Sequence, residues 1–282
     1  MLHGVIMKSI LTLALLLTSL SSMAQDATYF RAWQGFKNPK LTQGSFLQEL
    51  PLFMKDTVDL YRDHALVNYI VIIPPKNKPA FIPDEFALVA LTCKDDYQGI
   101  RQTTEGQRYG EKPWDLFNKE NSKSADPMID FTTELPKTLI HNNSYDTIGT
   151  PIDWSRGYNR VYIGIRKSSL TSIEFLKKLS AHAVMFKRTM IPRGVKGYVL
   201  IANNNYEVAY VNWESKQSHH DAYKTADGIA VTKDETQILD NLLYQETKPY
   251  MTNLRKNVIE GEAYSTLPAS YPYIGNYGGN GH

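Results

Sequence analysis

The stretch LTQGSFLQEL, residues 41–50, returns later in the chain as LTSIEFLKKL, residues 170–179. The two stretches share Leu, Thr, Phe, Leu and Leu at the same places, and they begin 129 residues apart. The same spacing continues without a gap to Tyr69, which corresponds to Tyr198. The chain therefore contains one sequence pattern twice, and we interpret it as two copies of one unit.

The later part of each copy aligns at a shorter spacing. Lys94 corresponds to Lys216, which lies 122 residues farther on. The difference of seven residues falls in the Pro- and Lys-rich stretch 74–83, where an insertion costs little because loop closure depends only weakly on loop length. Identities between the copies are few, so the main evidence for a duplication is that both copies predict the same elements in the same order.

Each copy predicts a strand, an amphipathic helix, two more strands and a second helix. Phe46, Leu50 and Met54 recur at helical spacing in the first copy, as Phe175 and Leu179 do in the second. The expected strands are 29–36, 66–73 and 86–93, then 160–166, 195–202 and 206–213. This order is most of a split βαβ unit, whose helices cover one face of an antiparallel sheet. We predict an α+β fold in which two ferredoxin-like units stack their bare sheet faces as an intramolecular α+β barrel.

The remaining segments differ in composition from the two units. A basic residue, a short apolar run and small residues up to Ala24 form the pattern of a signal peptide, with Met1 or Met7 as the start. The predicted divisions are a signal peptide at 1–24, a first unit at 25–103, an irregular connecting segment at 104–157, a second unit at 158–262 and a Gly/Tyr-rich tail at 263–282. We therefore expect a protein of the periplasm or of the cell exterior.

Charge and composition argue against several classes of function. The 282 residues carry 31 basic and 29 acidic side chains, a net charge of +2, without the basic stripe that nucleic-acid binding needs. No apolar run after residue 24 is long enough to cross a membrane, so we do not expect an integral membrane protein. Cys93 is the only cysteine, which rules out an internal disulfide, and its apolar neighbours predict a small buried side chain.

The second copy also resembles a known family. Its segments GVKGY, residues 194–198, and NYEVAYVNWES, residues 205–215, are similar to antibiotic-biosynthesis monooxygenases of the dimeric α+β barrel superfamily. The resemblance implies a ligand between the helices and the concave sheet of a unit, with either cofactor-free oxidation of an activated phenol or binding of haem. Haem-degrading members carry an Asn on the first strand and a His ten residues after the Trp, where this chain has Ile165 and Tyr223. The resemblance thus disfavours haem, and we predict no cofactor.

Candidate site residues gather in the second copy. Trp213 offers a flat surface and Asn212 a pair of hydrogen-bonding groups, but neighbouring strand residues point to opposite faces, so only one of them faces a given pocket. His182 aligns with Phe53 on the apolar face of the first helix. The predicted catalytic residues are His182, Trp213 and Asn212, and the predicted ligand-binding residues are Tyr198, Tyr210 and Phe186. Ordinary core packing is the alternative for each.

Two further polar groups are noted. His219 and His220 start the second helix of the second copy, where exposure to solvent is expected and a shared metal is not, because adjacent helical residues diverge. Four residues lie near the end of the corresponding helix of the first copy. We expect them either to form a polar cluster or to be exposed to solvent: Arg101, Glu105, Arg108 and Tyr109.

Two classes of function stay open. One is an enzyme related to the cofactor-independent monooxygenases, acting on a small hydrophobic or aromatic molecule. The other is a non-catalytic module that binds a ligand or a protein, the identity of which the residues do not give. The lack of a convincing acid–base pair favours the binding module. The second copy has His182 where the first has Phe53, and this difference favours a single specialised site. An enclosed cavity beside His182 would support the enzyme, and a filled core there would exclude it.

Overall fold

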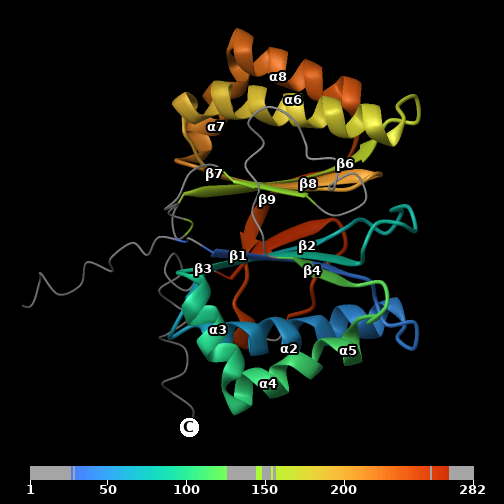
Figure 1. Cartoon of the computed structure of the whole chain (residues 1–282), viewed down its shortest axis with the longest axis vertical. Helices are drawn as coiled ribbons and strands as arrows, with labels where there is room; N and C mark the ends of the chain where they lie inside the picture. The colour runs from blue at the N-terminus through green and yellow to red at the C-terminus, as the bar shows by residue number, and fades with distance from the viewer. Residues whose placement is uncertain are drawn as a thin grey trace, which may run out of the picture.

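The computed structural model describes residues 27, 29–125, 144–147, 154, 157–254 and 256–266. Two sheets stack in the middle of the molecule, and helices cover the outer face of each (Figure 1). The predicted α+β fold is confirmed in this arrangement. The signal peptide predicted at 1–24 lies outside the described residues.

The first unit runs from residue 29 to residue 125. Its elements are β1 (Tyr29–Gly35), α2 (Gln43–Tyr61), β2 (Leu66–Ile73), β3 (Glu85–Leu91), α3 (Lys94–Gln102), α4 (Thr104–Glu111), α5 (Pro113–Leu116) and β4 (Lys123–Ala125). The strands lie in the order β4-β1-β3-β2, and each neighbouring pair is antiparallel. This is the β-α-β-β-α-β succession of a ferredoxin-like unit.

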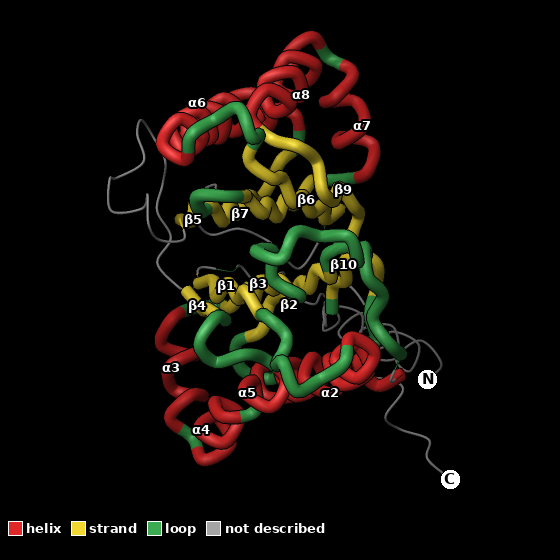
Figure 2. Tube along the Cα trace, turned by 90° about the vertical axis from the view of Figure 1, so that its right-hand side faces the viewer, coloured by secondary structure: helices red, strands yellow, loops and turns green. Residues whose placement is uncertain are grey.

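The second unit repeats that arrangement. Its elements are β6 (Tyr158–Arg166), α6 (Ser172–Met190), the 3-10 helix η3 (Ile191–Arg193), β7 (Val195–Ala202), β8 (Tyr206–Trp213), α7 (Lys216–Lys224), α8 (Ala226–Ile238) and β9 (Leu239–Pro249). The strands lie in the order β9-β6-β8-β7, which matches the order of the first unit. In the second view, α2, α3, α4 and α5 lie on one outer side and α6, α7 and α8 on the other (Figure 2).

Short strands extend both sheets and join them. The strand β5 (Ser144–Thr147) pairs with β7, and β10 (Glu262–Ser265) pairs with β2. In addition, β10 pairs in parallel with β9 across the two units, after the 3-10 helix η4 (Thr252–Leu254). The sheets therefore form a single series of strands from β4 to β5 that is folded over on itself.

The elements repeat at the spacing read from the sequence. The helices α2 and α6 have 19 residues each and begin 129 residues apart, while α3 and α7 have 9 residues each and begin 122 residues apart. A threonine starts both long helices: Thr42 accepts a hydrogen bond from the Ser45 amide, and Thr171 forms a capping box with Glu174. Such caps satisfy amide groups that a helix start leaves unpaired.

Three layers of apolar side chains hold the molecule together. One lies between the two sheets, and one lies between each sheet and its helices. The strand β8 shows how the layers are separated: Tyr206 and Val208 face the opposite sheet, whereas Ala209 and Val211 face the helices. A residue's parity along the strand therefore decides whether it lies in the central core or beneath the helices.

The structure differs from the sequence expectations in three places. Helices α4 and α5 and strand β4 occupy the start of the segment expected to be irregular, because Gly106 lets α4 turn closely against α3: a side-chain carbon there would lie 2.0 Å from the Ile100 carbonyl oxygen. Cys93 is half-buried and not in the core, since its sulfur caps α3 by accepting from the Asp96 amide. Residues 263–265, assigned to the tail, belong to β10.

The described residues were also searched for a membrane-spanning helix. None of their helices is both long enough and apolar enough to cross a membrane.

Candidate functional site

The second unit contains a cavity of about 350 Å³ between its helices and the outer face of its sheet. Residues of α6, α7 and α8 form one wall, and residues of β6, β7, β8 and β9 form the other. Most of the lining is aromatic or aliphatic: Val161, Tyr162, Phe186, Tyr198, Ala209, Val211, Trp213, Tyr223, Leu239 and Tyr244. A volume of this size, apolar with a few polar groups, is typical of a small-molecule site.

One titratable pair spans two helices at the cavity wall. His182 of α6 lines the cavity and is 4% exposed, and its Nδ1 lies 2.9 Å from Oδ2 of Asp234 on α8. The hydrogen bond from the histidine lowers the pKa of Asp234 below its usual range. The carboxylate fixes the orientation of the imidazole, and Nε2 is then the ring nitrogen that does not contact Asp234. An imidazole oriented in this way is suited to take up a proton.

Two carboxyl groups lie in the same cavity. Glu207 of β8 is 3% exposed, and its Oε2 has no hydrogen-bond partner among the described residues. Burial raises the pKa of Glu207 well above its usual value, and the nearby Glu235 raises it further. Burial likewise raises the pKa of Glu235, against a smaller opposing effect of His182. Both carboxyls are therefore biased towards the neutral, protonated form, because an unpaired charge is costly in an apolar setting.

The far end of the cavity is a cluster of rings around His219. This ring packs edge-on against Trp213, with 5.1 Å between centroids, and its Nε2 lies 2.6 Å from the Tyr244 hydroxyl. Arg160 lies over the ring of Tyr244, 3.9 Å from its centroid. Burial, followed by the positive charge of Arg160, lowers the pKa of His219 to about 4. The expectation that His219 is a solvated surface residue is therefore wrong, because α7 turns this side chain under the sheet.

The predicted site residues divide between the two faces of the sheet. His182, Phe186, Tyr198 and Trp213 all line the cavity. Tyr210 instead lies in the core between the two sheets. Asn212 shares the parity of Tyr210 and donates a hydrogen bond to Asn159 at 2.8 Å, away from the cavity. Of the pair Asn212 and Trp213, the strand therefore presents only the tryptophan to the cavity.

Several cavity residues were missed, and strand parity would have found some of them. Glu207 has the same parity as Trp213 along β8, so both point towards the helices. Arg160 shares a face of β6 with Tyr162. Asp234 and Glu235 come from α8, a helix that the sequence analysis did not predict, and no sequence signal placed them near His182. Ile165, on the first strand, packs against the central core, and Tyr223 lines the cavity.

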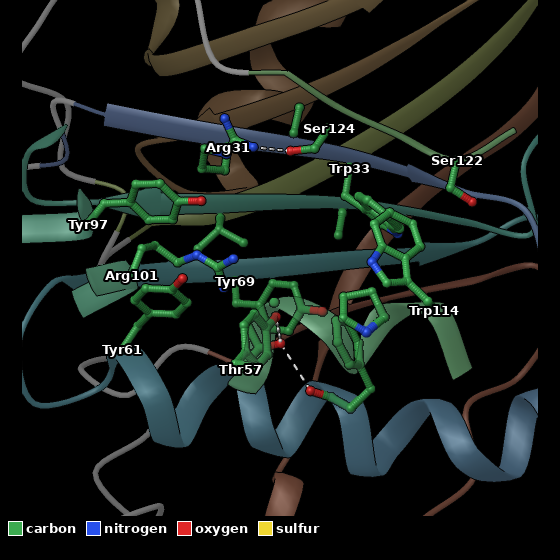
Figure 3. A pocket seen from close by; sticks show the side chains of 17 residues that line it. Arg31, Trp33, Thr57, Tyr61, Tyr69, Tyr97, Arg101, Trp114, Ser122 and Ser124 are labelled. Carbon is green, nitrogen blue, oxygen red and sulfur yellow. Dashed lines mark hydrogen bonds between the residues drawn. The ribbon is translucent and has the colours of Figure 1, made fainter. Parts of the chain in front are cut away.

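The first unit contains a cavity at the equivalent place, with a volume of about 230 Å³ (Figure 3). It lies between α2 and the sheet, with α3, α4 and α5 at its sides. Arg31, Trp33, Thr57, Tyr61, Tyr69, Tyr97, Arg101 and Trp114 are among its lining residues. Of the four polar residues noted near the end of α3, Arg101 and Tyr109 line this cavity, whereas Glu105 and Arg108 are exposed.

The polar groups of the two cavities differ. At the position of His182 the first unit has Phe53, which stacks on Tyr109 with 5.6 Å between ring centroids. Thr57 bonds the hydroxyl of Tyr109 at 2.7 Å. The described lining residues of the first cavity include two arginines and no carboxylate. Within the described residues, no group of three or more His, Cys, Asp or Glu side chains is placed to hold a metal ion.

The chain was compared with known proteins. No protein-family model matches it, and no curated protein matches it in sequence. A solved structure similar to it is that of a proposed monooxygenase from Lactobacillus acidophilus NCFM, with 10% identity, a TM-score of 0.36, and coverage of 78% of this chain and 96% of that chain. A proposed monooxygenase from Fusobacterium nucleatum has 11% identity, a TM-score of 0.40, and coverage of 78% and 94%.

A third similar structure is that of an anthrone oxidase-like protein, with 10% identity, a TM-score of 0.35, and coverage of 81% of this chain and 94% of that chain. These likenesses concern the fold alone. Neither family membership nor activity is carried over from them to this chain.

Proposed function

We propose that the second unit binds a small planar aromatic molecule in its cavity and, as a monooxygenase without a cofactor, removes a proton from it with His182. The observation that carries this proposal is His182, hydrogen-bonded to Asp234, in the wall of a cavity of about 350 Å³ that six Phe, Tyr and Trp side chains also line. Aromatic walls favour a flat ligand, since ring faces and edges attract one another beyond their apolar contact. An oriented histidine gives that ligand a base.

The chemistry requires only the ligand and dioxygen. His182 takes the proton of a phenol hydroxyl, and the resulting phenolate is electron-rich at the ring carbon opposite its oxygen. That carbon gives its electron pair to O2, and the hydroperoxide formed there loses water to leave a second carbonyl. For 1-naphthol the sum is one O2 consumed, with one 1,4-naphthoquinone and one water formed. Glu207 and Glu235 line the same cavity, and burial raises the pKa of both, which favours the protonated form that can donate to the departing oxygen.

The test uses 1-naphthol as the probe and two readouts on the same protein. Thermal unfolding measures binding, because a ligand at a hundredfold excess over its Kd adds about 2.7 kcal/mol to stability. Oxygen uptake and quinone absorbance measure turnover. We expect 1-naphthol to raise Tm in the parent protein and in His182→Phe, and we expect turnover to fall about a hundredfold or more in His182→Phe, as for loss of a general base.

A matched control is available in the same helical layer. His220 is exposed on α7 and does not line the cavity, so His220→Phe should leave both readouts unchanged. Turnover that survives His182→Phe would contradict the assignment of the base. Binding of 1-naphthol without oxygen uptake by the parent protein would favour the alternative, a non-catalytic binding module. That alternative already has one observation in its favour, since no histidine is found among the described lining residues of the equivalent cavity in the first unit.

We also propose that the protein is exported and that cleavage follows Ala24. The support is the basic, apolar and small-residue pattern of residues 1–24. Intact-mass measurement on protein recovered from the periplasm or the medium tests this. A mass that corresponds to a chain starting at Gln25 is expected, and a mass that includes residues 1–24 would contradict it.

A further inference from the structure

We propose that the cavity of the first unit is a second binding site, which takes a single aromatic ring bearing one carboxylate group. This site is separate from the one proposed above, because it is lined by residues of α2, α3, α4 and α5. These helices lie on the opposite outer side of the stacked sheets from α6, α7 and α8 (Figures 1 and 2). It differs from the cavity of the second unit in charge, in its polar groups and in size. Each difference points to an anionic ligand that is held and not turned over.

Charge is the first of these differences. Arg31 of β1 and Arg101 of α3 both line the cavity, and none of the described lining residues carries a carboxylate. The buried Glu85 on the neighbouring β3 has its pKa raised by burial to about 8, so it is mostly uncharged at neutral pH. The charged side chains among the described lining residues are therefore both arginines. Guanidinium groups are planar forks of donors that match a carboxylate, and a partly desolvated site strengthens that interaction.

The two ends of the cavity have different character (Figure 3). Arg31 and Arg101 lie at the same end as Tyr97 and Tyr61: Arg31 is 5.4 Å from the centroid of the Tyr97 ring, and the Tyr61 and Tyr97 rings stack with 5.7 Å between centroids. A pair of tryptophans lies at the other end.

The tryptophan end supplies an apolar aromatic wall. The rings of Trp33 and Trp114 are 5.9 Å apart between centroids, and both line the cavity. A ligand with a carboxylate at one end and a ring at the other matches this polarity. The volume fits one ring: a cavity of about 150 Å³ holds benzene, and this one measures about 230 Å³.

A glycine leaves room for the Arg101 guanidinium. A side-chain carbon at Gly110 would come within 2.6 Å of Nη2 of Arg101, so the arginine rests against the bare backbone of α4. At the equivalent places, 122 residues later, the second unit has Tyr223 and Thr232. The arginine and the glycine that accommodates it therefore occur together in the first unit and are both replaced in the second.

The first cavity lacks the group assigned as the base in the second. Phe53 stands where the second unit has His182, and its ring is stacked on Tyr109. A bound carboxylate would therefore be retained without proton transfer, which is consistent with a storage, sensing or regulatory site.

Isothermal titration with benzoate tests the proposal, with benzamide and acetate as probes that lack either the charge or the ring. We expect benzoate to bind once per chain, with benzamide and acetate at least tenfold weaker. Arg101→Gln should weaken benzoate at least tenfold, because a charge-assisted hydrogen bond is lost. The matched control is Arg108→Gln, which removes an equal charge from exposed α4 outside the cavity and should change the Kd less than twofold. His182→Phe should also leave benzoate binding unchanged.

Three results would overturn the proposal. They are equal binding of benzoate and benzamide, equal binding of benzoate and acetate, and an unchanged Kd in folded Arg101→Gln. If Arg101→Gln fails to fold, Gly110→Ala displaces the same guanidinium while keeping its charge, and an unchanged benzoate Kd in that variant would overturn the proposal equally.

Discussion

The two units use the same frame to build cavities of opposite chemistry. Arg31 and Arg160 occupy the same place on the first strand, and Tyr69 and Tyr198 the same place on the second. Around these constants the first cavity has a second arginine, Arg101, whereas the second cavity is larger and has His182 with two carboxyls whose pKa values are raised by burial. The comparison teaches that the frame depends on caps, strand parity and apolar packing, which the copies share, while the chemistry depends on a few side chains between helix and sheet.

The largest expected effect on stability concerns the apolar packing beneath α2 and α6, which is equivalent in the two units. Phe46 and Phe175 occupy equivalent places on α2 and α6, and both are fully buried. Phe46→Ala and Phe175→Ala should each lower the free energy of unfolding by about 3–5 kcal/mol, as for other deleted core rings. Urea unfolding measures this. Ile173→Ala is the control, because its side chain is 62% exposed. A large loss in one unit and a small one in the other would break the equivalence of the frames.

The buried glutamates predict the next largest effect. Glu85 and Glu207 are equivalent, and burial raises the pKa of both, that of Glu85 to about 8. The unfolded chain loses these protons near pH 4.5 while the folded protein keeps them, so stability falls as pH rises between 4.5 and 8. The slope is about 1.4 kcal/mol per pH unit for each group. Glu85→Gln should therefore remove about 2 kcal/mol of the loss between pH 6 and pH 8.

The control for that measurement is Glu105→Gln, which changes an exposed carboxyl on α4. Urea unfolding at pH 5, 6, 7 and 8 gives the slopes. Identical slopes for the parent protein and Glu85→Gln would show that Glu85 ionises freely in the folded state, and the two units would then differ in this respect.

His219 predicts a smaller effect of opposite sign, confined to the second unit. Burial lowers its pKa to about 4, whereas the first unit has Tyr97 at this place, a side chain without a basic nitrogen. The unfolded chain gains a proton near pH 6.5 and the folded protein does not, so stability falls as pH drops from 6.5 to 4. His219→Tyr should reduce the loss between pH 7 and pH 5 by about 1–2 kcal/mol. The same loss in His219→Tyr and in the exposed control His220→Tyr would refute this.

The frame was largely predictable because its signals are local. The helix caps and the helical spacing of apolar residues can each be read from a short stretch of sequence. The structure contains them in both units, with Thr42 and Phe46 in α2 and Thr171 and Phe175 in α6. The segment after residue 103 was misjudged because its glycines suggest a loop. Gly106 in fact permits close packing of two helices, a reason that only the third dimension reveals.

The candidate site was predictable only in part, for the same physical reason. His182 could be identified from the sequence because it lies on the apolar face of a predicted helix. The aligned position in the first copy is Phe53, so the histidine stands out there. Its partner Asp234 lies 52 residues away on α8, and the packing of two helices brings them to 2.9 Å. Tyr210 was misplaced because aromatic character predicts burial without saying which of the two cores a strand residue enters.

The smallest effect on stability is also the sharpest probe of the difference between the cavities. Gly110→Ala replaces a glycine near the end of α4, where alanine is favoured by about 0.5–1 kcal/mol in a helix. The new carbon would meet the far end of the flexible Arg101 side chain, which moves at little cost, so stability should stay level or rise slightly. Benzoate affinity should fall at least severalfold, because the guanidinium leaves its place. Gly99→Ala is the matched control, since nothing lies within 4 Å of a carbon added there. Equal benzoate affinity in the two variants would mean that the position of Arg101 does not distinguish the first cavity from the second.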